Sequence, residues 1–368
     1  MALSEERLEC WTFGGWETDR QYKRMGARAA LFTGDGAWVS SWRRRVVSAD
    51  TARMLAEGGI TIVMTHFYKG FGVKAEAKEW PRLKEMVKVY HEHGIRVLGY
   101  MQGRSIYYET LRAERPDLDD WVGRRYDGQA HTWGGCYYRL GPCLTSRGYI
   151  DYMKEVVRIG MVEIGLDGLH NDNSYYQHCW CKRCAGLFRD WLNAAPDLEA
   201  RTGLPNADYV EPPPLPDEWT RYDPLQIAWM EFGTQNRLKA MGELYATMKA
   251  LKPDGVYEQN PAFPRKGPYK ARLAVDPARE GAVCDVVCAE NSNLPRVSKG
   301  VVVSQAEAYL YGDAGGYHVL STTWNHDRDG MKPADTPGLL WAGLAEEFSY
   351  HAALLGHNWL LRPTADGA

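Results

Sequence analysis

Long apolar runs are absent from this sequence of 368 residues, and no window reaches the roughly 18 consecutive apolar residues of a membrane helix. The first residues, MALSEERLECWTF, are charged and lack the apolar core of a secretory signal peptide. We therefore expect a cytoplasmic protein without a membrane partner. The net charge is only −3, so a broad basic field for nucleic acid is also lacking, and a small or neutral ligand is favoured.

Phenylalanine is scarce among the aromatic residues, with 8 Phe against 14 Trp and 22 Tyr. Aromatic rings that carry a polar edge can stack on apolar faces and also donate hydrogen bonds, which is what a carbohydrate-binding cleft requires. A large core together with a homo-oligomer interface would explain the same composition. The composition leaves both interpretations open.

Apolar, β-branched segments alternate with segments of helical periodicity, which predicts a parallel sheet covered by helices. About eight such units predict a closed (β/α)8 TIM barrel with inserted loops. The first strand is expected at 13–16 or 29–32. The other expected strands are 60–65, 95–100, 165–172, 255–261, 283–291, 318–325 and 358–361. The main expected helices are 48–57, 80–93, 146–164, 224–251 and 337–355.

Two stretches interrupt this alternation. Residues 111–142 form a long aromatic excursion, and residues 193–224 form a proline-rich loop. Neither is followed by a change of composition. We therefore expect a single barrel domain over residues 1–368.

In barrels of this type the active site lies at the carboxyl ends of the strands. Asp172 ends the expected fourth strand, and Glu290 ends the sixth. His170 and Asp172 share one side of their strand because side chains alternate. Two carboxylates across the mouth of a barrel, one of them ionised and one protonated, are the groups that glycoside hydrolysis needs.

We therefore expect Asp172 to be the nucleophile and Glu290 to be the acid/base of a glycosidase in carbohydrate metabolism. Glu258 and Glu307 are rivals for the second role. A retaining reaction is the first choice, and an inverting one stays open because the two differ in the separation of the carboxylates. Asp172 could instead be a structural carboxylate that joins neighbouring loops.

Further polar and aromatic residues follow the expected strands and are candidates for contacts with a carbohydrate substrate. For each of them, ordinary loop packing is an equally good explanation. The candidates are His66, Lys69, Arg104, Tyr107, Trp133, His170, Asn171, Asn173, Glu258, Trp324 and His326.

Three cysteines, Cys179, Cys181 and Cys184, stand within six residues of one another. Thiolates at this spacing can surround one tetrahedral zinc ion if a fourth ligand joins them. Cys143 is the first choice for that ligand, and Cys136 and His178 are alternatives. Four cysteines leave no open position for water, so the expected Zn2+ is structural and not catalytic.

The cysteine region resembles the family-42 β-galactosidases. The matching residues are Cys179-Trp-Cys181-Lys-Arg-Cys184, the following Phe188-Arg-Asp-Trp191-Leu192, and the upstream Cys143. The segment 66–76 also resembles the second-strand loop of related TIM-barrel glycoside hydrolases. The resemblance covers roughly residues 38–191, and it implies a barrel fold and a zinc cluster.

The sequence departs from that family at the catalytic positions. Family-42 enzymes have Asn-Glu at strand four and a second Glu at strand seven. This chain has Asn171-Asp172 and no glutamate in 321–329. In this respect it is similar to the α-fucosidase-like and α-galactosidase-like clans, in which a strand-four Asp is the nucleophile. That resemblance implies an acid/base from a later strand, such as Glu290.

Two other functions fit the same residues. The first is a barrel that binds carbohydrate without catalysis. The second is a metal-dependent hydrolase that uses His66, His170 and Asp172 as ligands, which predicts a metal ion away from the cysteines.

Overall fold

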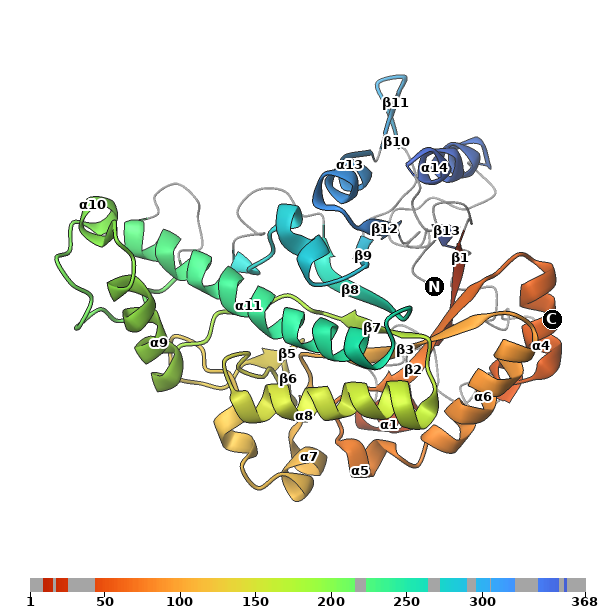
Figure 1. Ribbon diagram of the computed structural model, residues 1–368, viewed down its shortest axis with the longest axis horizontal. Coiled ribbons are helices and arrows are strands. Elements are labelled where there is room, and N and C mark those ends of the chain that lie inside the picture. Colours follow the sequence, from red (N-terminus) through yellow and green to blue (C-terminus); the bar gives the residue numbers. More distant parts are fainter. Residues whose placement is uncertain are drawn as a thin grey trace.

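An eight-stranded, all-parallel sheet forms the centre of the molecule (Figure 1). The computed structural model describes residues 9–15, 18–25, 44–215, 223–263, 272–289, 296–304, 306–321, 337–350 and 354–355. The strands of the sheet are β1 (Cys10–Gly15), β2 (Ile62–Tyr68), β3 (Arg96–Gln102), β7 (Gly168–Asp172), β8 (Val256–Phe263), β9 (Val286–Ala289), β12 (His318–Ser321) and β13 (Leu354–Leu355).

The strands follow the order β12-β9-β8-β7-β3-β2-β1-β13, and the two edge strands are in contact. In chain order the first seven of these strands pair one after the other, and the last strand, β13, pairs with the first, β1. This order confirms the predicted alternation of strands and helices around a curled parallel sheet. Closure of that sheet by hydrogen bonds between its edges stays a prediction.

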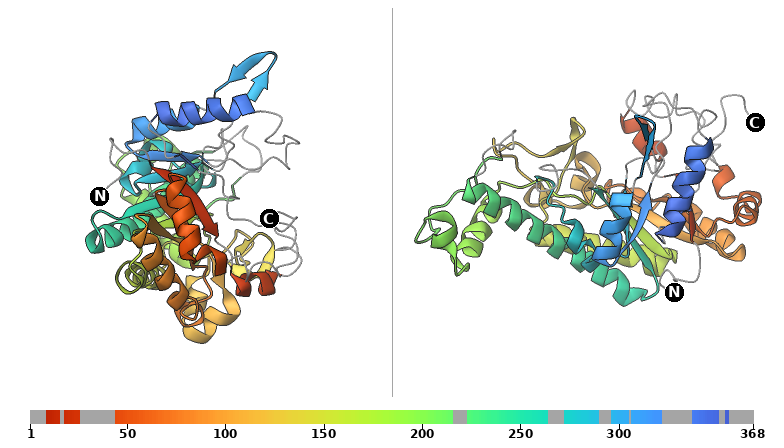
Figure 2. Two further views of the ribbon diagram at one scale, coloured as in Figure 1. Left: turned by 90° about the vertical axis from the view of Figure 1, so that its right-hand side faces the viewer. Right: turned by 90° about the horizontal axis from the view of Figure 1, so that it is seen from above.

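Helices cover the outer face of the sheet, as two perpendicular views show (Figures 1 and 2). Those close to the expected positions are α4 (Ala49–Glu57), α6 (Trp80–Glu92), α8 (Arg147–Arg158), α11 (Pro224–Leu251) and α14 (Pro337–Ser349). The other helical segments are α1 (Asp19–Met25), α5 (Val73–Glu76), α7 (Tyr108–Glu114), η1 (Leu118–Trp121), η2 (Ile159–Ile164), α9 (Lys182–Asn193), α10 (Leu198–Thr202), η3 (Pro277–Ala282) and α13 (Ala306–Gly315).

Local chemistry explains where these helices begin and end. The Ser48 hydroxyl accepts a hydrogen bond from the backbone N–H of Thr51 at the start of α4. Asp223 and Gln226 form a reciprocal capping box at the start of α11. The helical segment that begins with α8 ends at Gly165, whose φ of 84° is the left-handed conformation that glycine adopts without strain.

The two faces of the sheet have different cores. The outer face packs on the helices through a large cluster that includes Val63, Val97 and Leu169. The inner face holds a small separate cluster whose members alternate with the outer residues along each strand. This inner cluster consists of Trp11, Ile62, Met64, Leu98, Tyr100, Val256, Val286 and Leu320.

Small sheets extend the loops on either side of the main sheet. β4 (Ile106–Tyr107), β5 (Thr132–Trp133) and β6 (Cys136–Leu140) form a three-stranded antiparallel sheet within and just before the predicted excursion 111–142. β10 (Arg296–Ser298) and β11 (Val301–Val303) form a hairpin that the sequence did not predict. In the described part of the chain, no helix has the length and apolar character needed to cross a membrane.

Two predicted boundaries were wrong at the carboxyl end. The expected helix 337–355 ends at Ser349, and the last strand of the sheet is Leu354–Leu355, inside that predicted helix. A short apolar run fits a strand and a buried helix equally well, so periodicity could not separate them. The expected strand 358–361 lies outside the described residues. At the amino end, β1 overlaps the first of the two alternatives, and 29–32 is also not described.

Candidate active site and cysteine cluster

The inner face of the sheet changes from apolar to polar toward the carboxyl ends of the strands. The parallel register pairs His66 with Tyr100, Tyr100 with His170, and His170 with Glu258. These four side chains therefore form one layer across four neighbouring strands. The next layer toward the carboxyl end includes Gln102 and Asp172, which are also paired in register. The predicted phase of His170 and Asp172 is confirmed by this register.

Asp172 is almost completely buried, with 7% of its surface exposed, and it lies among hydrogen-bond donors. Gln102 Nε2 donates to its Oδ2 at 2.7 Å, and Asn260 Nδ2 donates to its Oδ1 at 3.0 Å. The Tyr100 hydroxyl and the Asn173 amide also donate to Oδ2. Four donors, from the strands β3 and β8 and from the loop after β7, therefore fix the orientation of this carboxylate.

These partners keep Asp172 ionised. Burial alone raises the pKa of a carboxyl group, because it removes water from the charged form. At Asp172, the interactions with His170 and Tyr100 and the charge of Lys69 outweigh burial, so its pKa lies well below the ordinary value. A carboxylate that stays negatively charged in a buried position is suited to attack an electrophilic carbon or to stabilise a positive charge.

His170 joins Asp172 to a second buried carboxylate. Its Nδ1 lies 2.9 Å from Glu258 Oε2, and its Nε2 lies 3.8 Å from Asp172 Oδ1. Burial lowers the pKa of this imidazole, but the charge of Glu258 and the interaction with Asp172 together raise it to about 9. The ring is therefore a cation at neutral pH. Glu258 is fully buried beside it and balances this positive charge.

The loop after β2 carries Lys69 into the same region. The Lys69 Nζ lies 3.6 Å above the ring centroid of Tyr100. Buried Glu76 holds the loop in place, since it accepts hydrogen bonds from the backbone N–H groups of Lys69 and Phe71 at 2.8–2.9 Å. Its Oε2 lies 3.4 Å from His66 Nε2, and burial raises the pKa of Glu76 to about 7.

Sequence reasoning missed Arg139, which comes from the small sheet and supports Asp172 indirectly. Its guanidinium is fully buried, donates to Gln102 Oε1, and donates from Nε to Ser105 Oγ at 2.7 Å. It also lies 3.8 Å from the ring centroid of Trp133. Tyr100 was missed too, although its place two residues before Gln102 on the same strand face was a usable signal. Arg139 offered no such signal, because it lies far from the barrel strands in sequence.

Two predicted substrate contacts instead occupy packed positions. The Asn171 amide accepts from the Gly103 N–H at 3.0 Å and donates to the Tyr257 hydroxyl at 3.1 Å, on the opposite strand face from Asp172. Tyr107 is fully buried, and its ring stacks on Phe71 at 3.7 Å between centroids. Asn171 and Tyr107 therefore hold loops together, because their neighbours leave no exposed face for a ligand.

Other predicted contacts remain close to the strand ends. Arg104 donates to Gln177 Oε1 at 2.8 Å and lies 4.2 Å from the ring centroid of Tyr175. Asn173 adopts a φ of 53°, a left-handed conformation that asparagine tolerates, and this turn brings its amide back to Asp172. Both side chains remain predicted substrate contacts.

The expected acid/base falls outside the described residues. Glu290, Trp324 and His326 all belong to the undescribed part of the chain. Of the two rivals, Glu258 is paired with His170, and Glu307 is exposed in the first turn of α13. Glu307 is therefore on an outer helix and not among the inward-facing residues.

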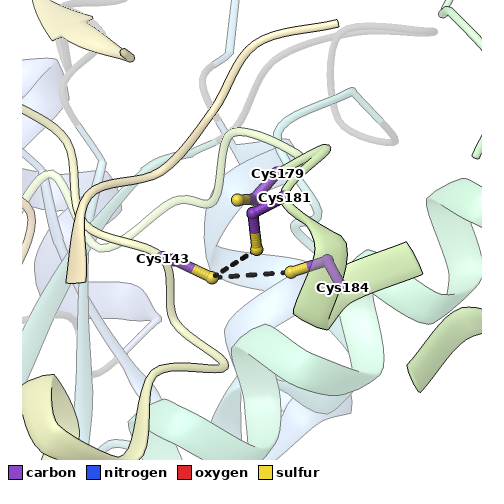
Figure 3. A group of neighbouring side chains, drawn as sticks. All are labelled: Cys143, Cys179, Cys181 and Cys184. Carbon is purple, nitrogen blue, oxygen red and sulfur yellow. Dashed lines mark hydrogen bonds between the residues drawn. The ribbon is translucent and has the colours of Figure 1, made fainter. Parts of the chain in front are cut away.

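The four predicted cysteine ligands come together in the structure (Figure 3). The sulfur atoms of Cys143, Cys179, Cys181 and Cys184 all lie within 4.8 Å of one another. Cys143 Sγ lies 3.4 Å from Cys184 Sγ and 3.9 Å from Cys181 Sγ. A tetrahedral ion with bonds of about 2.3 Å separates its sulfur ligands by about 3.8 Å. The donor set therefore fits a metal ion, and Cys143 lies at the position expected for the fourth ligand.

No second metal-type group was found in the described part of the chain. Among those residues, the four cysteines are the one set of at least three His, Cys, Asp or Glu side chains that converges on a point. His66, His170 and Asp172 do not converge, because His66 faces Glu76 and His170 lies between Glu258 and Asp172. The predicted alternative of a catalytic metal on these three residues is therefore wrong.

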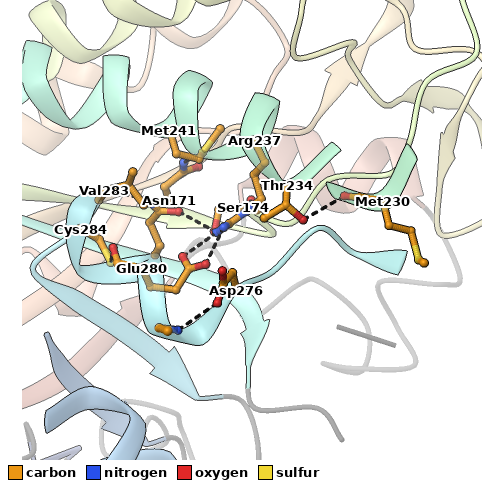
Figure 4. A network of polar contacts seen from close by, with 12 residues as sticks. Asn171, Ser174, Met230, Thr234, Arg237, Met241, Asp276, Glu280, Val283 and Cys284 are labelled. Carbon is orange, nitrogen blue, oxygen red and sulfur yellow. Dashed lines mark hydrogen bonds and ion pairs between the residues drawn. The ribbon is translucent and has the colours of Figure 1, made fainter. Parts of the chain in front are cut away.

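A buried ion pair fixes the loop that follows Asp172 from the outer side of the sheet (Figure 4). Arg237 of α11 makes two hydrogen bonds to Glu280, at 2.6 and 2.9 Å. Its Nε also donates to the backbone carbonyl of Ser174 at 2.7 Å, and it contacts Gln259 of β8. All of these side chains are fully buried. The ion pair therefore ties α11, β8 and the loop after β7 together.

Comparison with known proteins supports the fold. No family model matches the chain, and no curated protein matches it. Among solved structures it is similar to the β-galactosidase of Bacillus circulans sp. alkalophilus, with a TM-score of 0.62 and 15% identity over 95% of this chain and 50% of that one. It is also similar to the β-galactosidase of the psychrophilic Marinomonas ef1, with a TM-score of 0.63 and 15% identity over 95% of this chain and 54% of that one.

An α-L-fucosidase, isoenzyme 2 of Paenibacillus thiaminolyticus, gives a TM-score of 0.53 and 17% identity over 84% of this chain and 42% of that one. The chain thus spans about half the length of these proteins. At such low identity the likeness is one of fold. The chain shares a curled parallel sheet with these proteins, and its fourth strand ends in a buried, ionised aspartate.

Proposed function

We propose that this protein is a glycoside hydrolase that cleaves its substrate at the carboxyl end of the sheet. The observation that carries the proposal is the layer of inward-facing polar side chains around Asp172. Its carboxylate is ionised and oriented by four donors at the position where TIM-barrel enzymes hold their catalytic groups. The fold shared with β-galactosidases and an α-L-fucosidase supports the same reaction class.

In this proposal Asp172 attacks the anomeric carbon and forms a covalent glycosyl ester, while Glu290 protonates the leaving oxygen. Glu290 then removes a proton from water, which attacks the same carbon and releases Asp172. Net retention of configuration results. We assign Glu258 a supporting role, because it is fully buried against His170 and keeps that imidazole charged.

The remaining polar groups would bind and orient the sugar. Lys69, Arg104 and the protonated His170 are donors and suit sugar hydroxyl oxygens, and the donors to Asp172 limit its rotation. A closed (β/α)8 barrel and a structural Zn2+ at the four cysteines complete the proposal. The metal would join the segment after β6 to the start of α9, beside the reaction and not within it.

Two substitutions test the catalytic assignment. We expect Asp172→Asn to lower kcat/KM at least about 10³-fold, and Glu290→Gln to lower it by about 10²–10⁴-fold. Activity would be measured on a panel of p-nitrophenyl glycosides, with melting temperature as the control for folding. Full activity in both variants would refute the assignment.

Chemical rescue tests the retaining mechanism separately. In Asp172→Gly, a small anion such as azide can enter the vacated space and attack the anomeric carbon. We expect azide to restore turnover and to give a glycosyl azide of inverted configuration. Hydrolysis by the unmodified protein with inversion would instead assign Asp172 as a general base.

The proposed metal has its own test. We expect the unmodified protein to contain about one zinc ion per chain and Cys181→Ser to contain far less, because a four-cysteine site loses a ligand. Elemental analysis of purified protein measures this. An unchanged zinc content in Cys181→Ser would contradict the site.

A barrel that binds saccharides without turnover is the second candidate. The four donors to Asp172 favour it, because a carboxylate held by several hydrogen bonds is a weaker nucleophile than a free one. Saccharide binding with no turnover across the panel would select this candidate.

A further inference from the structure

The side chain of Gln102 lies between a buried cation and a buried anion. Its Nε2 donates to Asp172 Oδ2 at 2.7 Å and to the Tyr100 hydroxyl at 3.1 Å. Its Oε1 accepts a hydrogen bond from the guanidinium of Arg139. All four side chains are buried, and Arg139 has no exposed surface. The two ends of one amide therefore contact groups of opposite charge.

A primary amide has two ends that differ in chemistry but hardly in shape. A rotation of 180° about the last side-chain bond exchanges the carbonyl oxygen with the NH2 group, and the side chain fills nearly the same space. In one orientation the NH2 group of Gln102 donates to Asp172. In the other orientation a carbonyl oxygen faces the carboxylate, and two acceptors repel each other. Shape alone therefore does not decide which end faces Asp172.

Arg139 decides between these two orientations, because a guanidinium group donates hydrogen bonds and accepts none. Its contact with Gln102 requires the carbonyl oxygen at that end, which leaves the NH2 group for Asp172. The rotated amide would place donor against donor at Arg139 and acceptor against acceptor at Asp172. One orientation satisfies both contacts, and the other satisfies neither.

The guanidinium of Arg139 is itself held from several sides. In the antiparallel pairing of β4 with β6, Arg139 lies opposite Tyr107. Its Nε donates to Ser105 Oγ at 2.7 Å, and its guanidinium lies 3.8 Å from the ring centroid of Trp133 and 5.2 Å from that of Tyr107. Aromatic faces stabilise a cation in such a position. This support matters because only a fixed donor can select one orientation of the amide.

Arg139 differs from the other fully buried arginine of the described residues, Arg237. Arg237 makes two hydrogen bonds to the carboxylate of Glu280, which balances its charge directly. Among the described residues, the side-chain hydrogen bonds of Arg139 go only to neutral oxygen atoms. The Gln102 amide links its charge to the carboxylate of Asp172. An amide between two opposite charges is polarised by both, which strengthens each hydrogen bond.

We propose that Arg139 is a positioning residue for the candidate nucleophile: it fixes the Gln102 amide so that the NH2 group, and not the carbonyl oxygen, faces Asp172. The part of Asp172 in the reaction rests on the proposed function, whereas the orientation of the amide does not. This role also connects the small sheet to the reaction, since β6 carries Arg139.

Hydrogen exchange of side-chain amides tests the orientation at neutral pH and without any substrate. NMR on protein with isotope-labelled glutamine would follow the Nε2 hydrogens of Gln102, which are assigned by their absence in Gln102→Leu. We expect Arg139→Met to accelerate their exchange at least about tenfold, the factor that corresponds to one hydrogen bond to a charged group.

Gln259 provides the matched control within the same spectra. It is also fully buried, its Oε1 accepts from Arg237 at 3.3 Å, and its Nε2 donates to the Val283 carbonyl at 2.7 Å. Its exchange should stay unchanged in Arg139→Met, because Arg139 does not contact it. Equal acceleration at Gln259 and Gln102 would overturn the inference, since Arg139 would then support the fold as a whole.

Ser105→Ala is a milder second variant that keeps the guanidinium but removes the acceptor of its Nε. We expect the exchange of the Gln102 amide to become about threefold faster, the size of a hydrogen bond between uncharged partners or smaller. Melting temperatures would verify that each variant folds. Unchanged exchange at Gln102 in the folded variants would overturn the inference.

A double-substitution cycle tests the effect on the reaction. We expect Arg139→Met and Gln102→Leu each to lower kcat/KM about 10–100-fold. The double variant should lie within about threefold of either single one, because both substitutions remove the same oriented donor. Losses that multiply would overturn the inference, since Arg139 would then act independently of Gln102. Absence of hydrolysis together with accelerated exchange at Gln102 alone would reject the proposed function and retain Arg139 as the residue that orients the amide.

Discussion

Two buried charge clusters lie on opposite faces of the strands β7 and β8, and they differ in how their charges are balanced. On the outer face, Arg237 and Glu280 form a two-bond ion pair with fully buried partners. On the inner face, His170 lies between Glu258 and Asp172, and Asp172 retains some exposure. The outer cluster is closed on all sides, whereas the inner one opens at the strand ends.

This difference distinguishes buried charges that hold the structure together from buried charges that can take part in catalysis. A buried pair contributes little net stability, but the loss of one partner leaves an uncompensated charge. The inner cluster instead holds a charged carboxylate where a substrate can reach it. The two clusters should therefore respond in opposite ways to substitution, with stability lost on one side and activity lost on the other.

The largest expected effect is on the inner side. Asp172→Asn should reduce kcat/KM at least about 10³-fold, which corresponds to about 4 kcal/mol or more of transition-state stabilisation. Asparagine keeps the shape of the side chain but removes the charge that helps to balance His170, so the free energy of unfolding should also fall, by less than the loss of transition-state stabilisation. Steady-state kinetics and urea unfolding measure the two quantities. If the free energy of unfolding falls by as much as the transition-state stabilisation, the proposed contrast between the inner and outer clusters is wrong.

On the outer side we expect the reverse. Arg237→Met should lower the free energy of unfolding by about 3–5 kcal/mol, because Glu280 is left buried without its cation. The double variant Arg237→Met/Glu280→Met should recover most of this loss, since no charge remains. Urea unfolding of the three proteins measures the effect. A double variant no more stable than the single one would contradict this explanation.

The charge of His170 predicts a dependence of stability on pH. Its pKa rises from the ordinary 6.5 to about 9 on folding, so the folded state holds its proton more tightly. The resulting stabilisation is fully present below about pH 6.5 and is lost as pH rises through about 9, with a size of about 3 kcal/mol.

Unfolding free energies between pH 6 and 9.5 would reveal this slope, with His170→Asn as the control. Asparagine does not titrate in this range, so the variant should lack the His170 component of the slope. The same slope in both proteins would show that another group is responsible.

The smallest expected effect concerns one donor to Asp172. Tyr100→Phe removes the hydroxyl that donates to Oδ2 but keeps the ring under Lys69 and beside His170. We expect the pKa of Asp172 to rise. We also expect kcat/KM to fall by an amount that corresponds to about 2 kcal/mol of transition-state stabilisation, the usual size of a hydrogen bond to a charged group. The acid limb of the pH–activity profile should move to higher pH. An unchanged acid limb would argue against this hydrogen bond as a determinant of the ionisation of Asp172.

Local sequence signals were sufficient for much of the fold. As predicted, one helix begins after Ser48 and another ends at Gly165, and the β-branched run around Val63 forms a buried strand. These features were predictable because capping and the alternation of side chains depend on only a few neighbouring residues. The cysteine cluster was predictable because three of its four cysteines share one short segment. The last strand was misplaced, since its short apolar run was not distinctive.

The sequence by itself determined the alternation of strands and helices, the phase of Asp172 and three of the four residues of the cysteine cluster, and the structure selected Cys143 over Cys136 and His178 as the fourth. Tertiary structure decided the ionisation of Asp172 and the charge of His170, because both depend on partners from other strands and on burial. It also brought Arg139 to Gln102, 37 positions earlier in the chain, and placed Asn171 in a packed position. Distances between residues far apart in the chain arise only when the strands pair, and therefore no local pattern could supply them.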